Sequence, residues 1–420
     1  MEKIVTRHFG QENSHRLENY LKDNGYEAAR KALTQMTPAA VIEEVKKSNL
    51  RGLGGAGFPT GMKWSFIPQA NPKSKYLVIN GDEGEPGTFK DKYIFEQDPH
   101  ALLEGIIITC YAIGSHKAYV YIRGEYIKSI DTLQGAVDEA YKSGHLGRGI
   151  MGTDFDIDVV VHPGAGAYIC GEETALIESL EGKKGFPRLK PPFPAVVGLF
   201  GCPTVINNVE TISCVGPIIA KGAEWYAKLG CEKNGGNRLF CVSGHVVKPG
   251  VYELPNGTTL REIIYDHAGG IANGRKLKAV IPGGISAPIL TPDQIDVKMD
   301  FDSLKAIGTM AGSGGIIVMD DTTDMVWAAM VAARFYAHES CGQCSPCREG
   351  SGWVYRDIKR LYHGGAREHD LKNLPGIVNN IGGNTICAFG DAVSMCIGSY
   401  VTKFRSEFES KVKKNAESIH

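Results

Sequence analysis

In the stretch His338-Glu-Ser-Cys341-Gly-Gln-Cys344-Ser-Pro-Cys347-Arg-Glu-Gly350, three thiols follow one another at intervals of three residues. Thiolates this close repel one another unless a cation binds them, and a cubane iron–sulfur cluster takes one thiolate on each corner iron. The spacing matches the first three ligands of bacterial ferredoxin runs, but the nearby fourth cysteine of those runs is missing. We therefore expect Cys341, Cys344 and Cys347 to bind a [4Fe–4S] cluster together with a thiolate from elsewhere.

The fourth ligand is best sought in Asn384-Thr-Ile-Cys387-Ala-Phe-Gly390, a loop just before a helix-like run that starts near Asp391. Cys396 is the rival, but it lies in an apolar helical stretch and is more typical of a core residue. Zinc is the alternative metal, with His338 joining the three clustered cysteines. It usually takes two cysteine pairs, or cysteine with histidine across a longer loop, so the iron–sulfur interpretation is favoured.

Composition narrows the class of protein. A chain of 420 residues predicts two or three domains, and a formal net charge of -1 gives no basic field for nucleic acid. The N-terminus lacks the apolar region of a signal peptide, and the longest apolar run, Gly105 to Gly114, is too short to span a bilayer. Eleven irregularly spaced cysteines argue against a disulfide framework. We expect a soluble protein of a reducing compartment, not inserted in a membrane.

A glycine-rich loop follows a predicted helix. Gly52, Gly54 and Gly57 formally match the dinucleotide fingerprint, which should follow a strand and open a helix. Here the preceding residues 41–49 have apolar positions at helical spacing, so the usual Rossmann interpretation fails. Backbone N–H groups in such a loop can still face an anion, with Lys63 adding positive charge nearby. A phosphate-bearing cofactor is expected, and a plain flexible loop is the alternative.

Strands and helices then alternate, which predicts a mainly parallel sheet. Ligands bind at the carboxyl ends of such strands, and the acidic loop Gly81–Thr88 follows the first of them. The expected elements are strands at 76–80, 118–122 and 156–161 and helices at 99–114 and 128–142.

Two further segments could carry a ligand. After the third strand, glycines lead into a helix whose first turn holds Glu172 and Glu173, where the helix dipole favours anions. The proline-rich segment 186–194 must be extended and would hold Lys190 and Phe193 outward, suited to phosphate and base-stacking contacts. Stabilising a helix start and forming a rigid connector are the simpler roles of these two segments.

Five motifs in this order resemble the flavin-bearing NADH dehydrogenase subunit of respiratory complex I, the 51 kDa subunit family. The resemblance spans about residues 40 to 405 and rests on residues 51–64, 80–87, 164–174, 187–194 and 339–350. It implies a Rossmann-like FMN- and NADH-binding domain with N-terminal helices at 1–236. A β-grasp (ubiquitin-like) domain is expected at 237–320 and a four-helix bundle carrying the cluster at 321–420.

Within that bundle, the first helix is expected to be capped by Asp321 or Thr322 and to run to about His338. Further helices are expected at 352–362, 371–381 and 392–409.

The resemblance also implies site residues. FMN would be bound by Gly52, Gly54, Gly55, Lys63, Asn80, Asp82, Glu83, Tyr168, Gly171, Glu172, Asn207 and Asn208. NADH would be bound by Phe58, Phe66, Glu85, Glu173, Lys190 and Phe193. The cluster ligands would be Cys341, Cys344, Cys347 and Cys387.

The implied chemistry is hydride transfer from NADH to FMN, followed by single electrons to the [4Fe–4S] cluster. Glu85 and Glu173 would orient NADH, and no side chain need act as acid or base. Glu85 near the adenosine ribose should also repel the 2′-phosphate of NADPH. The implied partners are a small [2Fe–2S] subunit of the 24 kDa type and the peripheral arm of complex I, on the cytoplasmic, inner face of the membrane.

Two departures from the family pattern stand out. Leu53 replaces a common arginine of the glycine loop, and Ala388-Phe389 replaces the Pro-Leu that often follows the fourth cysteine. Two alternatives stay open. One is a diaphorase subunit of an NAD-linked hydrogenase or formate dehydrogenase, although the fused ferredoxin-like extensions of those versions are missing here. The other is a zinc-stabilised nucleotide-binding adaptor without a redox role.

Overall fold

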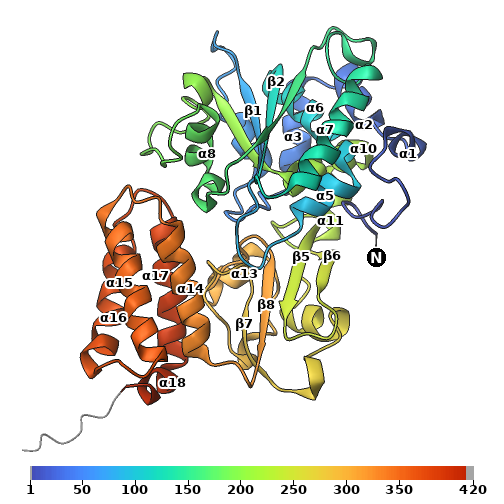
Figure 1. Cartoon of the computed structure of the whole chain (residues 1–420). Coiled ribbons are helices and arrows are strands. Elements are labelled where there is room, and N and C mark those ends of the chain that lie inside the picture. Colours follow the sequence, from blue (N-terminus) through green and yellow to red (C-terminus); the bar gives the residue numbers. More distant parts are fainter. Residues whose placement is uncertain (1, 413–420) are drawn as a thin grey trace, which may run out of the picture.

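The computed structural model describes residues 2–412, so the outer ends of the expected domains 1–236 and 321–420 lie outside the described residues. Figure 1 shows three parts: a sheet with helices on both faces, a second sheet, and a C-terminal group of helices. The predicted α/β class with a parallel sheet is confirmed. Within the described part, no helix is both long and apolar enough to cross a bilayer.

The first sheet has the strand order β3-β2-β1-β4, and all neighbours are parallel. Its strands are β1 (Tyr76–Gly81), β2 (Lys117–Ile122), β3 (Asp158–Pro163) and β4 (Thr204–Asn208). Side chains alternate between the two faces of a strand. Leu77 and Ile79 accordingly enter one core with α6 (Pro99–Ile113), α7 (Ile127–Lys142) and α9 (Val209–Ser213), whereas Val78 enters another with α8 (Glu173–Leu180).

Short helices form the N-terminal part. Asn24-Gly25 separates α1 (Leu17–Lys22) from α2 (Glu27–Gln35). Thr37 caps α3 (Pro38–Lys47) by accepting a hydrogen bond from the Ala40 N–H at 3.2 Å, and α4 (Thr60–Ser65) follows the glycine loop. Because a helix and not a strand precedes that loop, the rejection of a Rossmann fingerprint is confirmed. The remaining elements of this part are α5 (Asp91–Gln97), α10 (Val215–Lys221), α11 (Ala223–Leu229), η1 (Ile150–Gly152), η2 (Tyr168–Gly171) and η3 (Leu199–Gly201).

The second sheet has the order β6-β5-β8-β7, with a parallel central pair and antiparallel outer pairs. Its strands are β5 (Asn237–Gly244), β6 (Gly250–Pro255), β7 (Leu277–Ile281) and β8 (Gly315–Asp320). The helix after β6 begins with a capping box between Thr259 and Glu262 and becomes a π-helical turn, η4. The short elements here are α12 (Leu260–Glu262), η4 (Ile263–His267), η5 (Ala272–Gly274), η6 (Pro292–Gln294) and α13 (Phe301–Ala306).

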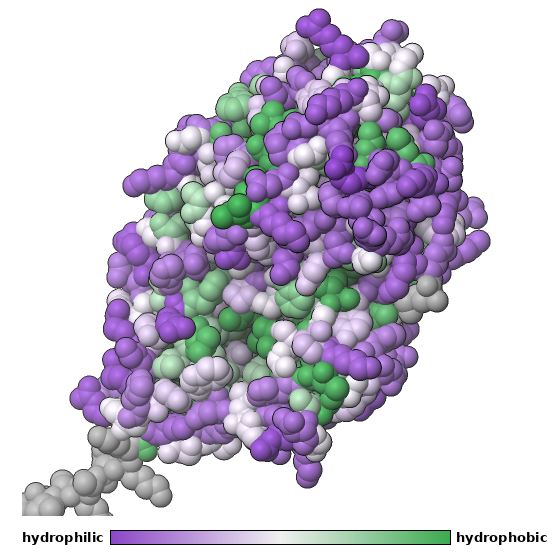
Figure 2. Space-filling view, turned by 45° about the vertical axis from the view of Figure 1, so that its right-hand side comes forward, coloured by the Kyte–Doolittle hydropathy of each residue, from purple (hydrophilic) through white to green (hydrophobic). Residues whose placement is uncertain are grey.

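Four long helices form the C-terminal group, and each packs on the next around a closed ring. They are α14 (Met325–Glu339), α15 (Ser345–Tyr362), α16 (Glu368–Ile381) and α17 (Phe389–Lys403), followed by the short α18 (Arg405–Ser410). Their shared core contains Val354, Ile358, Leu374 and Ile397, all fully buried. The face of the molecule in Figure 2 is mostly hydrophilic, with hydrophobic side chains in patches in both its upper and lower halves.

The boundaries of these helices correct three predictions. Asp324 caps α14 by accepting from the N–H groups of Val326 and Trp327, so the predicted caps Asp321 and Thr322 are wrong. Thr322 instead donates to Asp320 in the preceding turn. α15 begins at Ser345, earlier than predicted, because Pro346 is tolerated in a first helical turn. The last predicted helix is divided at Phe404 into α17 and α18.

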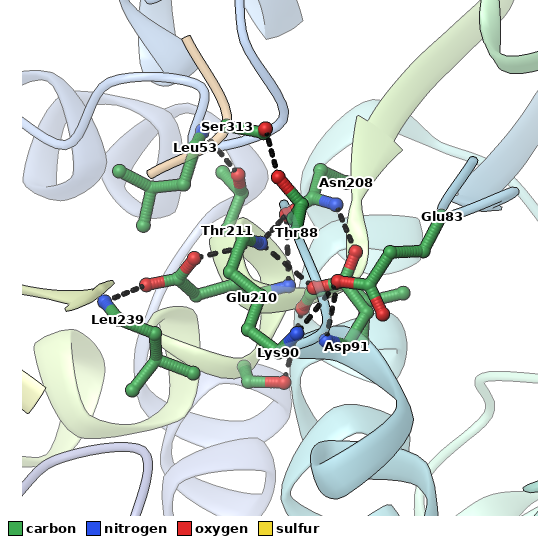
Figure 3. A network of polar contacts seen from close by, with 12 residues as sticks. Leu53, Glu83, Thr88, Lys90, Asp91, Asn208, Glu210, Thr211, Leu239 and Ser313 are labelled. Atoms are coloured by element: carbon green, nitrogen blue, oxygen red, sulfur yellow. Dashed lines mark hydrogen bonds and ion pairs between the residues drawn. The ribbon is translucent and has the colours of Figure 1, made fainter. Parts of the chain in front are cut away.

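A buried group of charges joins the first sheet to the second (Figure 3). The Lys90 ammonium, 1 % exposed, lies 2.8 Å from carboxylate oxygens of both Asp91 and Glu210. Glu210 also accepts from the N–H of Leu239 on β5 at 2.6 Å. Burial by itself lowers the pKa of Lys90, but Asp91, Glu210 and Glu83 outweigh it and raise that pKa. The charge stays on the lysine, and its partners hold the two sheets together.

We predict that Lys90→Met lowers the free energy of unfolding by about 3 to 5 kcal/mol, because it leaves buried carboxylates without a cation. Urea denaturation of the two proteins measures the difference. Lys128→Met is the matched control: Lys128 also makes an ion pair at 2.7 Å, but its side chain is 78 % exposed. Exposed pairs contribute little, so this control should unfold like the unchanged protein. Equal stability of all three proteins would contradict the prediction.

Candidate functional site

The carboxyl ends of the four parallel strands meet at one edge of the first sheet, and there the predicted strand-end residues converge. Asn80 on β1 is the register partner of Asn208 on β4. The amide of Asn80 donates to the carbonyl oxygen of Gly171 at 2.8 Å, which brings the η2 segment to the same edge. Asn207 lies one residue earlier on β4 and accepts from the Trp64 indole N–H at 2.9 Å.

The glycine loop packs against this edge. A Cβ at Gly54 would lie 2.8 Å from the Cβ of Asn208, so only glycine allows this approach. Gly55 has φ +139 and would meet no heavy atom within 4 Å, which leaves open space above it. Leu53 donates its N–H to the Thr211 hydroxyl at 2.9 Å and buries its side chain in the core. Leu53 thus brings no charge to the loop, and Lys63 and the backbone amides remain as its anion-binding groups.

Asp82 provides an acceptor that the protein leaves unused. Its Oδ2 atom is buried and has no hydrogen-bond partner among the described residues. Burial raises the pKa of this carboxyl to about 7, although the nearby Arg123 opposes the shift. Buried polar atoms are nearly always paired, so an unpaired one beside Gly171, at the carboxyl end of β1, indicates a missing donor. The hydroxyl groups of FMN are donors of this kind, and this edge of the sheet fits that cofactor.

Glu83 faces in another direction. Its carboxylate accepts from the N–H groups of Lys90, Asp91 and Lys92 at the start of α5, at 2.8, 2.9 and 3.3 Å. The Tyr126 hydroxyl adds a fourth hydrogen bond at 3.1 Å. The side chain is therefore engaged within the protein. The Glu83 carbonyl oxygen also accepts from Arg123 at 2.9 Å, which leaves the backbone N–H for the predicted flavin contact.

Two lysines and two glutamates form a charged cluster at the site. Glu173 lies 3.1 Å from Lys63 and 2.8 Å from Lys190, and Lys190 also reaches Glu172 at 3.0 Å. Burial raises the pKa of Glu173, but the two lysines outweigh it and lower that pKa to about 2. Glu172 also caps α8 by accepting from Thr174, the simpler role weighed for this residue. Residues predicted for FMN and for NADH are thus joined in one cluster.

Three exposed phenyl rings lie in the segments that carry Lys63 and Lys190. Phe58 and Phe66 flank α4 with ring centroids 6.0 Å apart, and they are 44 % and 54 % exposed. Phe193 lies three residues after Lys190 and is 59 % exposed. Large exposed rings of this kind suit stacking on a base.

Glu85 and Tyr168 connect the strand-end loops to the C-terminal helices. The Tyr168 hydroxyl donates to Glu85 at 2.6 Å, and the Tyr168 N–H donates to Glu339 at 3.2 Å. Its ring packs on Phe335 and Phe389, with centroids 5.0 and 5.8 Å away. Burial raises the pKa of Glu85, and the hydrogen bonds from its neighbours offset part of the shift.

The four predicted cluster cysteines line one small cavity at the end of the helical bundle. The lining consists of Ile169, Ser340, Cys341, Gln343, Cys344, Cys347, Thr385, Cys387, Phe389 and Gly390. Cys396, the rival ligand, does not line it and lies fully buried in the core of the bundle. The side chain of His338 is 82 % exposed and turns to Glu339, away from a zinc site with the cysteines.

The chemistry of these thiols fits a cluster. Burial raises the pKa of Cys347 to about 11 and that of Cys387 to about 12. Such thiols ionise only when a cation takes the place of the proton, as iron does. Among the described residues, no group of three or more His, Cys, Asp or Glu side chains is placed to hold a single metal ion. Four thiols spread around a cavity suit a cubane, which takes each thiolate on a different iron.

Sequence reasoning missed several residues that shape the site. Lys90 and Glu210 lie outside the glycine motifs, and only their burial reveals them. Ser286 binds Glu85 from the loop after β7, and the two glycines before it were the signal that its backbone approaches another segment. Glu339 lies within the cysteine motif, but its contact with Tyr168 depends on tertiary packing.

Three families match successive parts of the chain. Residues 45–216 match the Nuo51 FMN-binding domain, residues 238–318 match the SLBB domain, and residues 327–411 match the NADH-ubiquinone oxidoreductase-F iron-sulfur binding region. These matches agree with the positions of the first sheet, the second sheet and the cysteine cavity.

Full-length relatives give the same result. The chain is 52% identical to the F 2 subunit of NADH-quinone oxidoreductase of Rhizobium meliloti, over 100% of both chains. It is 51% identical to the F subunit of NADH-quinone oxidoreductase of Rickettsia conorii, over 99% of this chain and 98% of the relative. A crystal structure of an NAD+-reducing [NiFe]-hydrogenase is similar with a TM-score of 0.85 and 36% identity, over 95% of this chain and 68% of that one. The chain therefore belongs to the family of NADH-quinone oxidoreductase F subunits, which are oxidoreductase subunits with FMN and a [4Fe–4S] cluster.

Proposed function

We propose that this chain oxidises NADH as the electron-input subunit of an NADH-quinone oxidoreductase. The observation that carries the proposal is the convergence of the glycine loop, the unpaired Asp82 carboxylate and exposed aromatic rings at one sheet edge, linked through Tyr168 to the four-cysteine cavity. FMN takes two electrons as a hydride and releases them singly, as passage from nicotinamide to an iron–sulfur cluster requires. The protein's own residues bind, orient and screen these groups.

The residue roles that we assign are those implied by the family motifs. The N–H groups of Gly54 and Gly55 would face the FMN phosphate, with Lys63 nearby, while Gly52 shapes the loop by donating its own N–H to the Phe58 carbonyl oxygen at 2.9 Å. Asp82 accepts from the flavin's hydroxyl groups. The other FMN residues are Asn80, Glu83 through its backbone, Tyr168, Gly171, Glu172, Asn207 and Asn208. Phe58, Phe66 and Phe193 flank NADH, while Glu85, Glu173 and Lys190 orient it.

Binding of the phosphates exchanges partners within the charged cluster. Lys63 and Lys190 are paired with Glu172 and Glu173. A phosphate group competes with these carboxylates for the lysines, because both are oxygen anions. We infer that Lys63 turns from Glu173 toward the FMN phosphate, which frees the Oε2 atom of Glu173 for NADH while its Oε1 atom stays paired with Lys190.

The cluster ligands are Cys341, Cys344, Cys347 and Cys387, in a bundle that we assign to residues 321–420. The order of the second sheet supports a β-grasp domain at 237–320, after an FMN and NADH domain at 1–236. A single cluster must pass its electrons to another acceptor, which implies a partner with its own iron–sulfur centre. The partner is of the small [2Fe–2S], 24 kDa type, within a peripheral arm on the cytoplasmic, inner face of the membrane.

One observation supports a different enzyme complex for this chain. The chain is 36% identical to a solved NAD+-reducing [NiFe]-hydrogenase chain, so a diaphorase role in a hydrogenase or formate dehydrogenase is the alternative. Purification of the chain with its native partners separates the two. Co-purification with hydrogenase or formate dehydrogenase subunits would contradict the quinone-reductase assignment and leave the NADH chemistry in place.

The direct test is a visible spectrum of anaerobically purified protein before and after NADH is added. We expect bleaching of the flavin band, with about one FMN and about four irons per chain. A colourless protein that contains zinc, purified under conditions that retain flavin and iron–sulfur cofactors, would contradict the proposal and favour the nucleotide-binding adaptor.

We predict that Cys387→Ser removes the cluster, because it deletes one of four thiolates in the cavity. Iron content should fall well below four per chain, measured by chemical iron analysis and by the loss of cluster absorption, while bound FMN is retained. Cys396→Ala is the matched control, since this buried thiol does not line the cavity, and it should keep its iron. The reverse pattern would assign the fourth ligand to Cys396.

We predict that FMN binding to the flavin-free protein weakens as the pH falls below about 7. The pKa of Asp82 is raised to about 7 by burial, and a flavin hydroxyl that donates to the carboxylate favours its charged form. Affinity is therefore complete above that pH and falls by up to about tenfold per pH unit below it. Titration of FMN fluorescence at several pH values measures this. Asp82→Asn should remove the weakening that begins at about pH 7 and leave only that caused by protonation of the FMN phosphate near pH ~6. A flat profile of the unchanged protein would contradict the prediction.

A further inference from the structure

The acidic loop Gly81–Thr88 is pressed against the SLBB segment, residues 238–318. The Ile285 N–H donates to the carbonyl oxygen of Pro86 at 3.1 Å, and the hydroxyl groups of Thr88 and Ser313 are hydrogen-bonded. A Cβ at Gly315 would lie 2.7 Å from the carbonyl oxygen of Gly87, so the two backbones touch without room for a side chain. The loop that carries Glu85 is thus held by a different part of the chain.

The same SLBB segment also donates hydrogen bonds to the Glu85 carboxylate. Its Oε1 accepts from the Ser286 N–H at 2.7 Å, and its Oε2 accepts from the Ser286 hydroxyl at 3.1 Å. The Tyr168 hydroxyl adds a hydrogen bond to Oε2 at 2.6 Å. Tyr336 on α14 donates to the Ser286 oxygen at 3.5 Å, which leaves the serine proton for Glu85.

These hydrogen bonds leave one acceptor position open. An ionised carboxylate accepts about four hydrogen bonds, and three are used here, two of them by Ser286. The remaining lone pair is on Oε1. The backbone of Gly284 lies against this side chain, so closely that a Cβ there would be 2.5 Å from the Glu85 Cγ. Glu85 therefore presents a single acceptor in one direction.

We propose that Ser286 of the SLBB segment is a positioning residue for NADH, holding Glu85 so that its one free lone pair meets the ribose hydroxyls of the nucleotide. The inference rests on the proposed function, in which Glu85 contacts NADH. A free glutamate could swing away from the 2′-phosphate of NADPH, whereas a held carboxylate keeps its charge in place. Ser286 then contributes to the preference for NADH, although it belongs to a segment without cofactor-binding motifs.

The test is a double-mutant cycle on holoprotein with FMN and cluster, using Ser286→Ala, Glu85→Gln and the double variant. Oxidation of NADH and of NADPH is followed with ferricyanide as the electron acceptor. We expect Ser286→Ala to raise the KM for NADH about fivefold with kcat within about twofold of the unchanged protein. The NADH-to-NADPH ratio of kcat/KM should fall by about fivefold. In the Glu85→Gln background, Ser286→Ala should have no further effect, because the serine acts only through Glu85.

Ser243→Ala is the matched control. Ser243 is a half-buried serine of the same segment, on β5, and its hydroxyl donates to the Ile316 carbonyl oxygen at 3.4 Å. It should leave both KM values and the FMN and iron content unchanged. An equal effect of Ser243→Ala would show general loosening of the segment and overturn the proposal.

Four other results also overturn it, and they show which step of the argument fails. Unchanged kinetics in Ser286→Ala, or an equal effect of that change with and without Glu85, contradicts the positioning role alone. An unchanged nucleotide preference in Glu85→Gln contradicts the role of Glu85 as well. Failure of NADH to bleach the flavin of the unchanged protein contradicts the proposed function together with the inference.

Discussion

The structure depends on keeping one buried cation, Lys90, fully compensated. Its ammonium lies between Asp91 and Glu210, and hydrogen bonds continue from them to Asn208 and to β5 (Figure 3). A charge out of water is tolerated only when partners surround it, so these segments must assemble together. The network lies directly behind the strand ends, and it holds the asparagine that the glycine loop packs against.

The charges of the candidate site, in front of that network, are compensated in the same way. Two lysines neutralise two glutamates, and the buried thiols of the cavity keep raised pKa values. Each group is stable without a cofactor but would gain from one, since phosphates suit the lysines and iron suits the thiols. Asp82 is the exception, with a buried oxygen left unpaired. The cofactor side of the site thus completes interactions that the protein leaves partly made.

Local patterns predicted the parts of the structure that local physics governs. Three strands of the first sheet and the helix ahead of the glycine loop were found, because period and turn residues act over a few positions, whereas β4 (Thr204–Asn208) was not predicted. The cap of α14 and the start of α15 were not. Thr322 is hydrogen-bonded to Asp320 and does not cap α14, and Pro346 allows α15 to begin earlier than predicted. The ends of both helices therefore depend on the contacts of neighbouring residues.

The sequence by itself determined the chemistry: three closely spaced thiols, a glycine loop and the motifs that identify the family. Only the tertiary structure decided which side chains take part in that chemistry. Burial brings Cys387, and not Cys396, to the cavity, turns Glu83 into a helix cap, and joins Glu85 to Ser286, 201 positions away along the chain. Residue types and short spacings carry chemistry, but contacts between distant segments depend on packing, which no local pattern records.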